Sequence, residues 1–247
     1  MSSSQFFVLI DSRDKSTGTS YDFQCYFNGF NMYSGSSVEI SVDQVILFNL
    51  QYPINQYNKT ITFQENSDTG VSYTATLTEG SYTGSEIATE IASQLTANTG
   101  NAITYTGSYD NNTGKLTISA SALNFKLTSI NEIFGYEVMT SFASSKVGDY
   151  PVNLSGPDYV DLLCPSLVND NMISRSLTTT GIMKRIPLTV GFGGLVNYQS
   201  SQPDDSIIVD RSYLETIRMK LQNPDGSSYL LPSNSHVSIT LRCRVLI

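Results

Sequence analysis

Apolar and polar residues alternate along much of this chain with a period near two, in short segments that end at turn-forming residues. In 236–247 (HVSITLRCRVLI) the Val, Ile, Leu and Cys residues from Val237 to Cys243 fall on one face, and Ser, Thr and Arg fall on the other. The segments 22–28 and 38–42 alternate in the same way. Successive side chains of a strand point to opposite faces, so this pattern predicts half-buried β-strands.

Further short runs of strand-forming residues are separated by Gly, Pro, Asn and Asp. They lie at 5–10, 44–50, 60–64, 71–78, 103–109, 115–120, 124–128, 159–163, 181–194, 207–209 and 213–221. The turn Asn223-Pro-Asp-Gly226 joins the last of these runs to the C-terminal one. Pro presets φ, Asp bonds its own backbone and Gly accepts a positive φ, so this turn has a physical basis. The pattern predicts a mainly β fold.

One stretch of the chain, EGSYTGSEIATEIASQLTANTG, has the pattern of a helix. Thr83 and Glu86 have the spacing of a capping box, in which each side chain bonds the main chain of the other residue. Its apolar residues recur at every fourth position, at Ile87, Ile91 and Leu95. The pattern predicts one helix with a single apolar face toward a core.

The helix and the strands around it form a group that separates two blocks of strands. A strand at 71–78, the helix, a hairpin through Asp110-Asn-Asn-Thr-Gly114 and a closing IFGY segment make a β-α-β-β unit. We therefore predict an antiparallel single jelly-roll sandwich formed by 1–70 and 140–247, with a small α+β domain inserted at 71–139. An immunoglobulin-like sandwich is disfavoured because the chain has no Trp and no Cys…Trp…Cys pattern.

Composition adds a neutral, hydrogen-bonding surface to this picture. Only 15% of the 247 residues are charged, the net charge is −8, and there are 15 Tyr. Tyr is enriched at protein interfaces, so the composition favours wide contact with other protein. No basic run is present, and we expect no direct contact with nucleic acid. We expect no disulfide framework or zinc site from three widely spaced cysteines, Cys25, Cys164 and Cys243.

We expect no signal peptide and no membrane span. The first residues, MSSSQFFVLIDSRDK, carry no basic region, and no apolar stretch approaches the ~18 residues of a membrane span. The sequons at Asn58, Asn111 and Asn153 are interpreted as chance matches. We expect a soluble protein made in a cytoplasm.

The candidate catalytic residues lack the neighbouring motifs that catalysis requires. The single histidine, His236, has no GxSxG or other nucleophile motif to serve. Cys164 lies in an apolar segment and is interpreted as core packing. Glu86 and Glu90 lie one turn apart on the predicted solvated face of the helix. We assign no catalytic residue and no cofactor.

Two acidic loops and one Gly-rich loop are candidate ligand sites. Asp110-Asn111-Asn112 and Asp204-Asp205 offer oxygens to Ca²⁺, but no complete calcium-binding loop is present. Gly191-Phe-Gly-Gly194 lacks the Lys-Ser/Thr of a phosphate loop and is interpreted as a bend. We assign no metal site.

The most suggestive charged cluster is formed by Asp11, Arg13 and Asp14. An Arg can bind a carboxylate of a neighbouring subunit through two parallel hydrogen bonds. A solvated turn is the equally weighted alternative. These three residues are our candidates for an inter-subunit contact.

Four stretches of the sequence resemble a known family. FVLIDSRDKSTGTSYDFQCYF, VEISVDQVILFNLQYPIN and ETIRMKLQNPDGSSYLLPSNSHVSITLRCRV resemble the opening, following and final strands of the penton (vertex) proteins of virophages, polinton-like viruses and related large double-stranded DNA viruses. These are minor capsid proteins with a single jelly roll. The helical unit resembles a β-α-β-β unit that recurs in such capsid proteins and in some tail proteins.

The resemblance implies a structural virion protein and no enzymatic activity. It implies homopentamers at the five-fold vertices of an icosahedral capsid, with trimers of the major capsid protein as neighbours. It also implies a location in the virion after synthesis in the host cytoplasm or a viral factory. The alternatives are a trimeric tail or fibre protein that attaches to a host and a carbohydrate-binding β-sandwich module.

Overall fold

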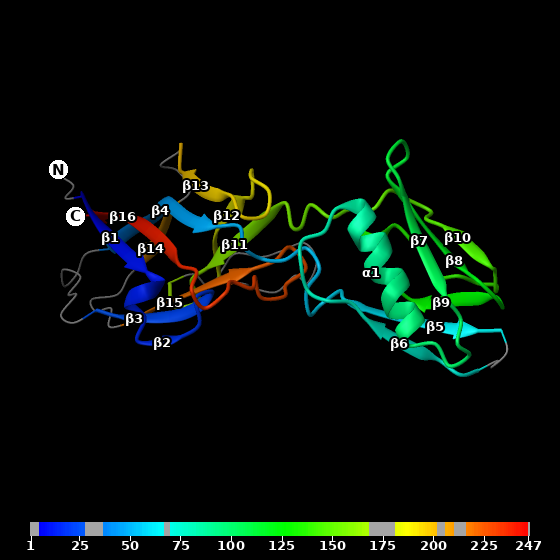
Figure 1. Ribbon diagram of the computed structural model, residues 1–247. Helices are drawn as coiled ribbons and strands as arrows, with labels where there is room; N and C mark the ends of the chain where they lie inside the picture. Colours follow the sequence, from blue (N-terminus) through cyan, green and yellow to red (C-terminus); the bar gives the residue numbers. More distant parts are fainter. Residues whose placement is uncertain are drawn as a thin grey trace. The chain divides into compact units, whose positions relative to one another are not determined.

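The computed structural model describes residues 5–27, 37–66, 70–167, 181–201, 206–209 and 216–246. The chain forms two compact units. The first combines Met1–Gln51 with Pro157–Ile247, and the second is Tyr52–Gly156. The first unit is therefore built from both ends of the chain, and the second is a continuous segment between them (Figure 1).

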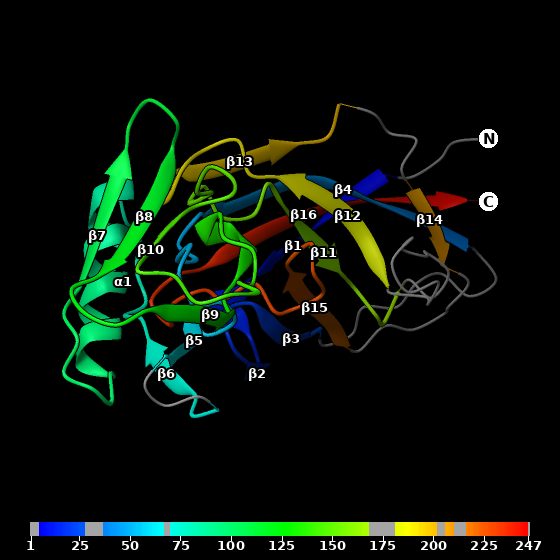
Figure 2. The ribbon, with the colours of Figure 1, turned by 90° about the vertical axis from the view of Figure 1, so that its right-hand side faces the viewer.

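The first unit is a sandwich of two antiparallel sheets, as predicted (Figures 1 and 2). In the first sheet the strands run in the order β1, β16, β4 and β13, and β14 also pairs with β4. Their bounds are β1 (Gln5–Asp11), β16 (Val237–Leu246), β4 (Ser37–Phe48), β13 (Leu195–Gln199) and β14 (Ser206–Val209). The described strands of the second sheet are, in order, β12 (Ile182–Pro187), β11 (Tyr159–Leu163), β15 (Thr216–Gln222), β3 (Asp22–Tyr26) and β2 (Thr17–Gly18).

Strand β16 lies between β1 and β4 and pairs with both over nearly its full length. Its inward residues from Val237 to Cys243 are buried, which confirms the alternation seen in the sequence. The sequence predicted separate strands at 38–42 and 44–50. The structure forms the single strand β4, in which Asp43 is an extra residue opposite the register shift between Thr240 and Leu241. Such a bulge lets the strand continue while it shifts the alternation of buried and exposed residues.

The inner faces of the two sheets enclose one apolar core, to which Phe23, Val45, Leu162 and Met219 contribute. Two polar side chains buried beside this core, Tyr229 and Asn49, form a hydrogen bond with each other. The Tyr229 hydroxyl donates to Asn49 Oδ1 at 2.7 Å. Because buried polar groups without partners are costly, this bond fixes the chain after the last turn against the end of β4.

The second unit contains two small antiparallel sheets and one α-helix within its described residues. One sheet has the order β6 (Tyr73–Thr76), β5 (Thr60–Glu65) and β9 (Phe125–Ser129). The other has the order β10 (Ser145–Val147), β8 (Lys115–Ala120) and β7 (Tyr105–Asp110). The helix is α1 (Gly84–Ala97), and the short 3₁₀ turn η2 (Glu132–Phe134) follows β9.

The helix begins and packs as its sequence predicted. Thr83 is the N-cap, and its hydroxyl accepts a hydrogen bond from the Glu86 main chain, while Glu86 accepts one from the Thr83 N–H. The apolar stripe from Ile87 to Leu95 is fully buried against β6, β7 and β8. A side chain at Gly107 in β7 would place its Cβ 2.0 Å from the Ala88 carbonyl oxygen, so the close approach of helix and strand requires glycine.

The second unit is longer than the insertion of 71–139 that the sequence suggested. It also contains 52–70 and 140–156, which the sequence analysis had assigned to the jelly roll. The reason is strand pairing between distant segments, since β5 pairs with β6 and β9, and β10 pairs with β8. Local periodicity identifies a strand but does not identify its partner.

One carboxylate is buried in the second unit. Glu65, fully buried at the end of β5, accepts hydrogen bonds from Thr99 Oγ1 at 2.5 Å, Asn101 Nδ2 at 2.7 Å and the Tyr105 hydroxyl at 3.0 Å. Burial, together with this neighbouring carboxylate, raises the pKa of Tyr105. These bonds hold the end of β5 to the segment that follows the helix.

Replacing Thr83 with Ala removes the hydroxyl that caps α1. We expect the stability of the helix to fall by about 1 kcal/mol, because one main-chain N–H of the first turn loses its partner. Hydrogen exchange of peptides from α1 measures this loss. Thr89→Ala, on the exposed face of the same helix, is the control, and equal exchange in the two variants would contradict the assigned cap.

Replacing Tyr229 with Phe keeps the ring and removes the donor to Asn49. We expect a loss of about 1–3 kcal/mol in the free energy of unfolding, because the buried Asn49 oxygen is left without a partner. Urea unfolding of the variant measures the loss. Tyr26→Phe, on a side chain that is 56% exposed, should change the unfolding free energy by far less.

Candidate functional site

The predicted Asp11–Arg13–Asp14 cluster lies where β1 runs into the short 3₁₀ turn η1 (Ser12–Asp14). Arg13 donates from Nε to Asp11 Oδ1 at 2.9 Å and from Nη2 to Asp11 Oδ2 at 2.6 Å. The Arg13 main-chain N–H also donates to Asp11 Oδ1, at 2.8 Å. The bidentate pair foreseen with a neighbouring subunit is thus already made within the chain. Asp14 is exposed on the same turn.

This ion pair changes the titration of Asp11. The side-chain hydrogen bond from Arg13 holds the pKa of Asp11 below its ordinary value, and the main-chain N–H of Arg13 adds to the effect, while partial burial opposes it. The turn itself is anchored because the buried Ser12 hydroxyl accepts a hydrogen bond from the Val237 main chain at 3.0 Å. Asp11 and Arg13 therefore hold a defined position beside β16.

A groove of about 460 Å³ opens beside this pair, which we call the Asp11–Phe48 groove. Its apolar wall comes from Ile46 to Leu50 at the end of β4 and just beyond it. The remaining lining residues are Asp11, Arg13, Asn234, Ser235, His236 and Ser238. Ser235 is only 4% exposed, and its hydroxyl has no hydrogen-bond partner among the described residues. His236, the single histidine, is exposed at this groove.

The outward face of β1 carries two large apolar side chains, Phe7 and Leu9, which we call the β1 ridge. Phe7 is 52% exposed and Leu9 is 74% exposed. β1 is the end strand of its sheet in the part of the chain that the structure describes. Exposed apolar residues on an edge strand are unusual in a free monomer, because edges of this kind associate with other chains.

Charged residues on the same outward face are paired with one another. Arg242 on β16 forms an ion pair with Asp43 on β4, and Arg244 lies 3.7 Å from Glu39. The face between the β1 ridge and the Asp11–Phe48 groove is otherwise formed by neutral residues such as Thr240 and Gln44. A surface of this kind can be covered by protein without leaving a charge unpaired.

The alternation pattern alone does not identify the β1 ridge or the apolar wall of the groove. The available signal was the run Phe6-Phe7-Val8-Leu9-Ile10, which is apolar on both faces of a strand. A strand with only one buried face alternates, so apolar residues on both faces indicate that both faces are covered. In the part of the chain that the structure describes, only the inward face of β1 is covered.

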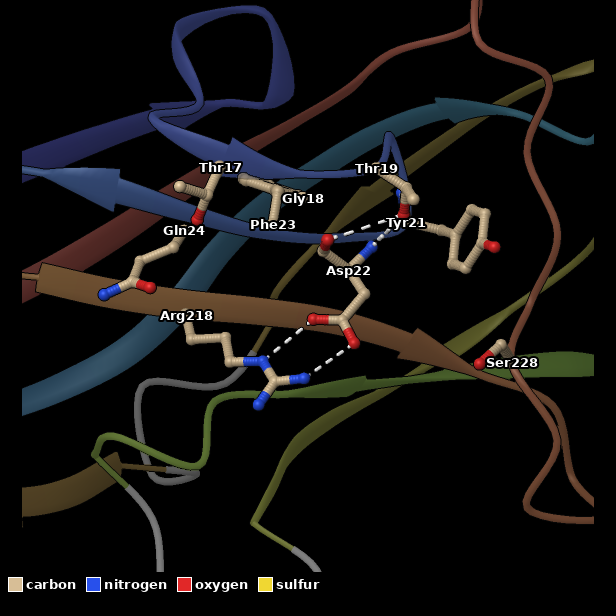
Figure 3. Close-up of a pocket in the computed structure, with 9 residues that line it drawn as sticks. All are labelled: Thr17, Gly18, Thr19, Tyr21, Asp22, Phe23, Gln24, Arg218 and Ser228. Carbon is tan, nitrogen blue, oxygen red and sulfur yellow. Dashed lines mark hydrogen bonds and ion pairs between the residues drawn. The ribbon is translucent and has the colours of Figure 1, made fainter.

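A second hollow of about 490 Å³ lies on the outer side of the other sheet, around β2 and β3 (Figure 3). Arg218 on β15 reaches Asp22 on β3 and donates from Nε and Nη2 at 2.9 and 2.8 Å (Figure 3). Gly18 adopts a φ of +99°, and a Cβ there would lie 2.2 Å from the Asp22 carbonyl oxygen. The two charged groups of this hollow, Asp22 and Arg218, therefore bind each other.

The remaining acidic candidates accept hydrogen bonds from nearby residues of the chain where the structure describes them. Glu90 accepts a hydrogen bond from the Thr78 main chain at 2.8 Å, so it is not a purely solvated residue as predicted. Asp110 accepts hydrogen bonds from the Thr113 hydroxyl and the Asn112 N–H, which lower its pKa within the hairpin turn. Asp204-Asp205 lie outside the described residues.

The Gly-rich loop forms a bend, as the sequence analysis interpreted it. Gly193 N–H donates to the Asn49 carbonyl, and Gly194 N–H donates to the Gly191 carbonyl. Among the residues that the structure describes, no group of three or more His, Cys, Asp or Glu side chains has the arrangement of a metal site.

The three cysteines are buried and free. Burial raises the pKa of all three thiols, that of Cys243 to about 11. A thiol is a nucleophile in its deprotonated form, so these groups are poor nucleophiles near neutral pH. Cys164, interpreted as core packing, lies in the core of the first unit.

Across its described residues the chain contains no helix long and apolar enough to span a membrane. The two sheets, their strand order and the α+β segment between their two halves define a class of protein, a jelly-roll sandwich with an inserted unit.

The crystal structure of the SeMet-labelled mavirus penton protein has a similar fold. The match covers 100% of this chain and 100% of that chain, with a TM-score of 0.54 and 10% sequence identity. The resemblance to penton proteins and the predicted jelly roll are thus confirmed at the level of the fold. No protein-family model matches the chain, and no curated protein matches it.

Replacing Arg13 with Met removes the side-chain donors to Asp11. We expect the pKa of Asp11 to rise toward its ordinary value of 3.8, as measured by an NMR titration of its carboxyl carbon. In the unchanged protein the lowered pKa favours folding above about pH 4, and this contribution is lost as the pH falls through the lowered value. Arg218→Met is the control, and an unchanged Asp11 titration in Arg13→Met would contradict the pairing.

Proposed function

We propose that this chain is a structural capsid protein, the penton subunit that forms pentamers at the five-fold vertices of an icosahedral virion. The observation that carries the proposal is the similarity of fold to the mavirus penton protein over the full length of both chains. The proposal includes no enzymatic activity and no cofactor.

The outward face of the first sheet supports the proposal on physical grounds. A ring of copies needs two different contact surfaces on each subunit, since each copy binds its neighbours in a head-to-tail manner. A specific contact buries about 800 Å² on each partner. The outward face of the first sheet offers exposed apolar residues for one of these contacts, at the β1 ridge and in the adjoining Asp11–Phe48 groove.

The proposed partners follow from the resemblance to penton proteins. Copies of this chain bind one another, and trimers of the major capsid protein surround the pentamer. The net charge of −8 disfavours direct contact with the genome, because a phosphate backbone is bound by Lys and Arg. The mature protein resides in the virion, and it is made in the host cytoplasm or a viral factory.

Native mass spectrometry of the purified chain, together with negative-stain images, tests the proposal. We expect closed rings of five copies, the number that the resemblance to vertex proteins implies. Three copies would contradict the proposal and favour a trimeric fibre or tail subunit. A monomer at all accessible concentrations would also count against it, and glycan-binding assays would then test the carbohydrate-binding alternative.

A further inference from the structure

The hollow beside β2 and β3, which we call the Asp22–Arg218 hollow, has mainly polar walls (Figure 3). Its volume is about 490 Å³, which lies within the range of about 300–1,000 Å³ that small-molecule sites occupy. Most of its lining residues have polar side chains, and two are aromatic, Tyr21 and Phe23. Phe23 is 1% exposed and belongs to the core, so Tyr21 supplies the only accessible ring among the lining residues.

The two charged side chains of the hollow neutralise each other. Arg218 donates from Nε and Nη2 to the two carboxylate oxygens of Asp22, at 2.9 and 2.8 Å. This pairing leaves Arg218 Nη1 and one lone pair on each Asp22 oxygen available for further hydrogen bonds. The pair therefore offers donors and acceptors without a net charge, and neither an anion nor a cation meets an uncompensated charge in the lining.

Uncharged polar side chains lie on both sides of this pair. Figure 3 shows Thr17 and Gln24 on one side and Tyr21 and Ser228 on the other. The Thr17 hydroxyl, the Gln24 amide and the Ser228 hydroxyl form no hydrogen bond with any residue that the structure describes. Such exposed groups bind water in the free protein, and the hydroxyl groups of a ligand can replace that water because a hydroxyl both donates and accepts.

Main-chain hydrogen bonds hold the walls of the hollow in place. The Thr19 N–H donates to the Asp22 carbonyl at 2.8 Å, and the Thr19 hydroxyl accepts from the Asp22 N–H at 3.0 Å. The Leu221 N–H in β15 donates to the Tyr21 carbonyl at 2.7 Å. Because these segments are fixed before any ligand binds, binding costs little additional ordering of the chain.

We propose that the Asp22–Arg218 hollow binds a neutral carbohydrate, a sugar with neighbouring hydroxyl groups and no charge. Sugar hydroxyls donate to the free lone pairs of Asp22, and Arg218 Nη1 and the Gln24 amide donate to sugar oxygens. The Tyr21 ring offers an apolar face to the C–H groups of the sugar and carries a polar hydroxyl at its tip. The site goes beyond the proposed function, because it needs one copy of the chain and no ring.

A peptide ligand fits these observations less well. β2 is the end strand of its sheet among the described strands, but it has only two residues, Thr17–Gly18, and cannot pair with an added strand of useful length. Protein contacts also depend on large anchors that are buried in dry pockets. The hollow has many neutral donors and acceptors instead, and these match a ligand with many hydroxyl groups.

A glycan array probed with the purified chain tests the proposal. The probes are immobilised oligosaccharides that end in galactose, N-acetylgalactosamine, mannose or fucose, with sialylated and sulfated forms of the same oligosaccharides beside them. We expect binding to a subset of the neutral oligosaccharides and no gain from the added charges. Saturation-transfer NMR with the best of these oligosaccharides in soluble form then gives the Kd of a single site, whatever the oligomeric state of the chain.

Variants of the lining residues locate the binding. Gln24→Ala removes the amide and leaves the Asp22–Arg218 pair intact, and we expect the Kd to rise about tenfold because hydrogen bonds to the sugar are lost. Gln199→Ala, at an exposed glutamine of β13 outside the hollow, is the matched control and should bind as the unchanged chain does. Arg218→Met releases Asp22 from its partner and should weaken binding at least as much.

Circular dichroism checks that each variant is folded. Thr17→Val keeps the shape of an exposed side chain while it removes a hydroxyl, and it replaces Arg218→Met if that variant unfolds. The site is wrong if no neutral oligosaccharide binds, or if the folded lining variants bind as well as the unchanged chain. Preference for the charged oligosaccharides would overturn the neutral ligand. An empty array, together with random-library peptides whose binding depends on Gln24, would assign the hollow to a protein partner.

These outcomes are separate from those of the proposed function. A chain that forms rings of five copies but binds no oligosaccharide loses this site and keeps its proposed role in the shell. A monomeric chain that binds a neutral oligosaccharide through Gln24 keeps this site and loses the proposed role.

Discussion

The first unit depends on one interaction, the pairing of β16 with both β1 and β4. This pairing joins the two ends of the chain in one sheet (Figure 1). The hydrogen bond from the Val237 main chain to the buried Ser12 hydroxyl extends it beyond the end of β1. Because both ends of the chain are fixed in this sheet, the segment between them is free to form a unit with its own core, Tyr52–Gly156.

The same pairing assembles the outward surface. Residues of β1, β4 and β16 are far apart in sequence, yet the β1 ridge and the Asp11–Phe48 groove lie on one sheet because these strands are neighbours. The bulge at Asp43 lies within this surface, where Asp43 pairs with Arg242. A face with paired charges and exposed apolar residues suits burial against protein, and the proposed shell role requires such a face.

The buried polar groups show how the loops of the two units are fixed. Tyr229 bonds Asn49 in the first unit, and Glu65 accepts three hydrogen bonds in the second. These groups hold long connections in one conformation, since an alternative conformation would leave them unpaired. The three cysteines are part of the apolar packing of the first unit, and their raised pKa values make them poor nucleophiles near neutral pH.

The sequence by itself determined the features that depend on neighbouring residues. The alternation in β16, the apolar stripe of α1 and the capping box at Thr83 are local patterns, and the structure has each of them as predicted. Tertiary structure decided the partner of Arg13, the exposure of Phe7 and Leu9, the continuity of β4 through its bulge, and the assignment of β5 to the second unit. Each of these depends on which distant segment lies alongside, and periodicity along the chain carries no information about that neighbour.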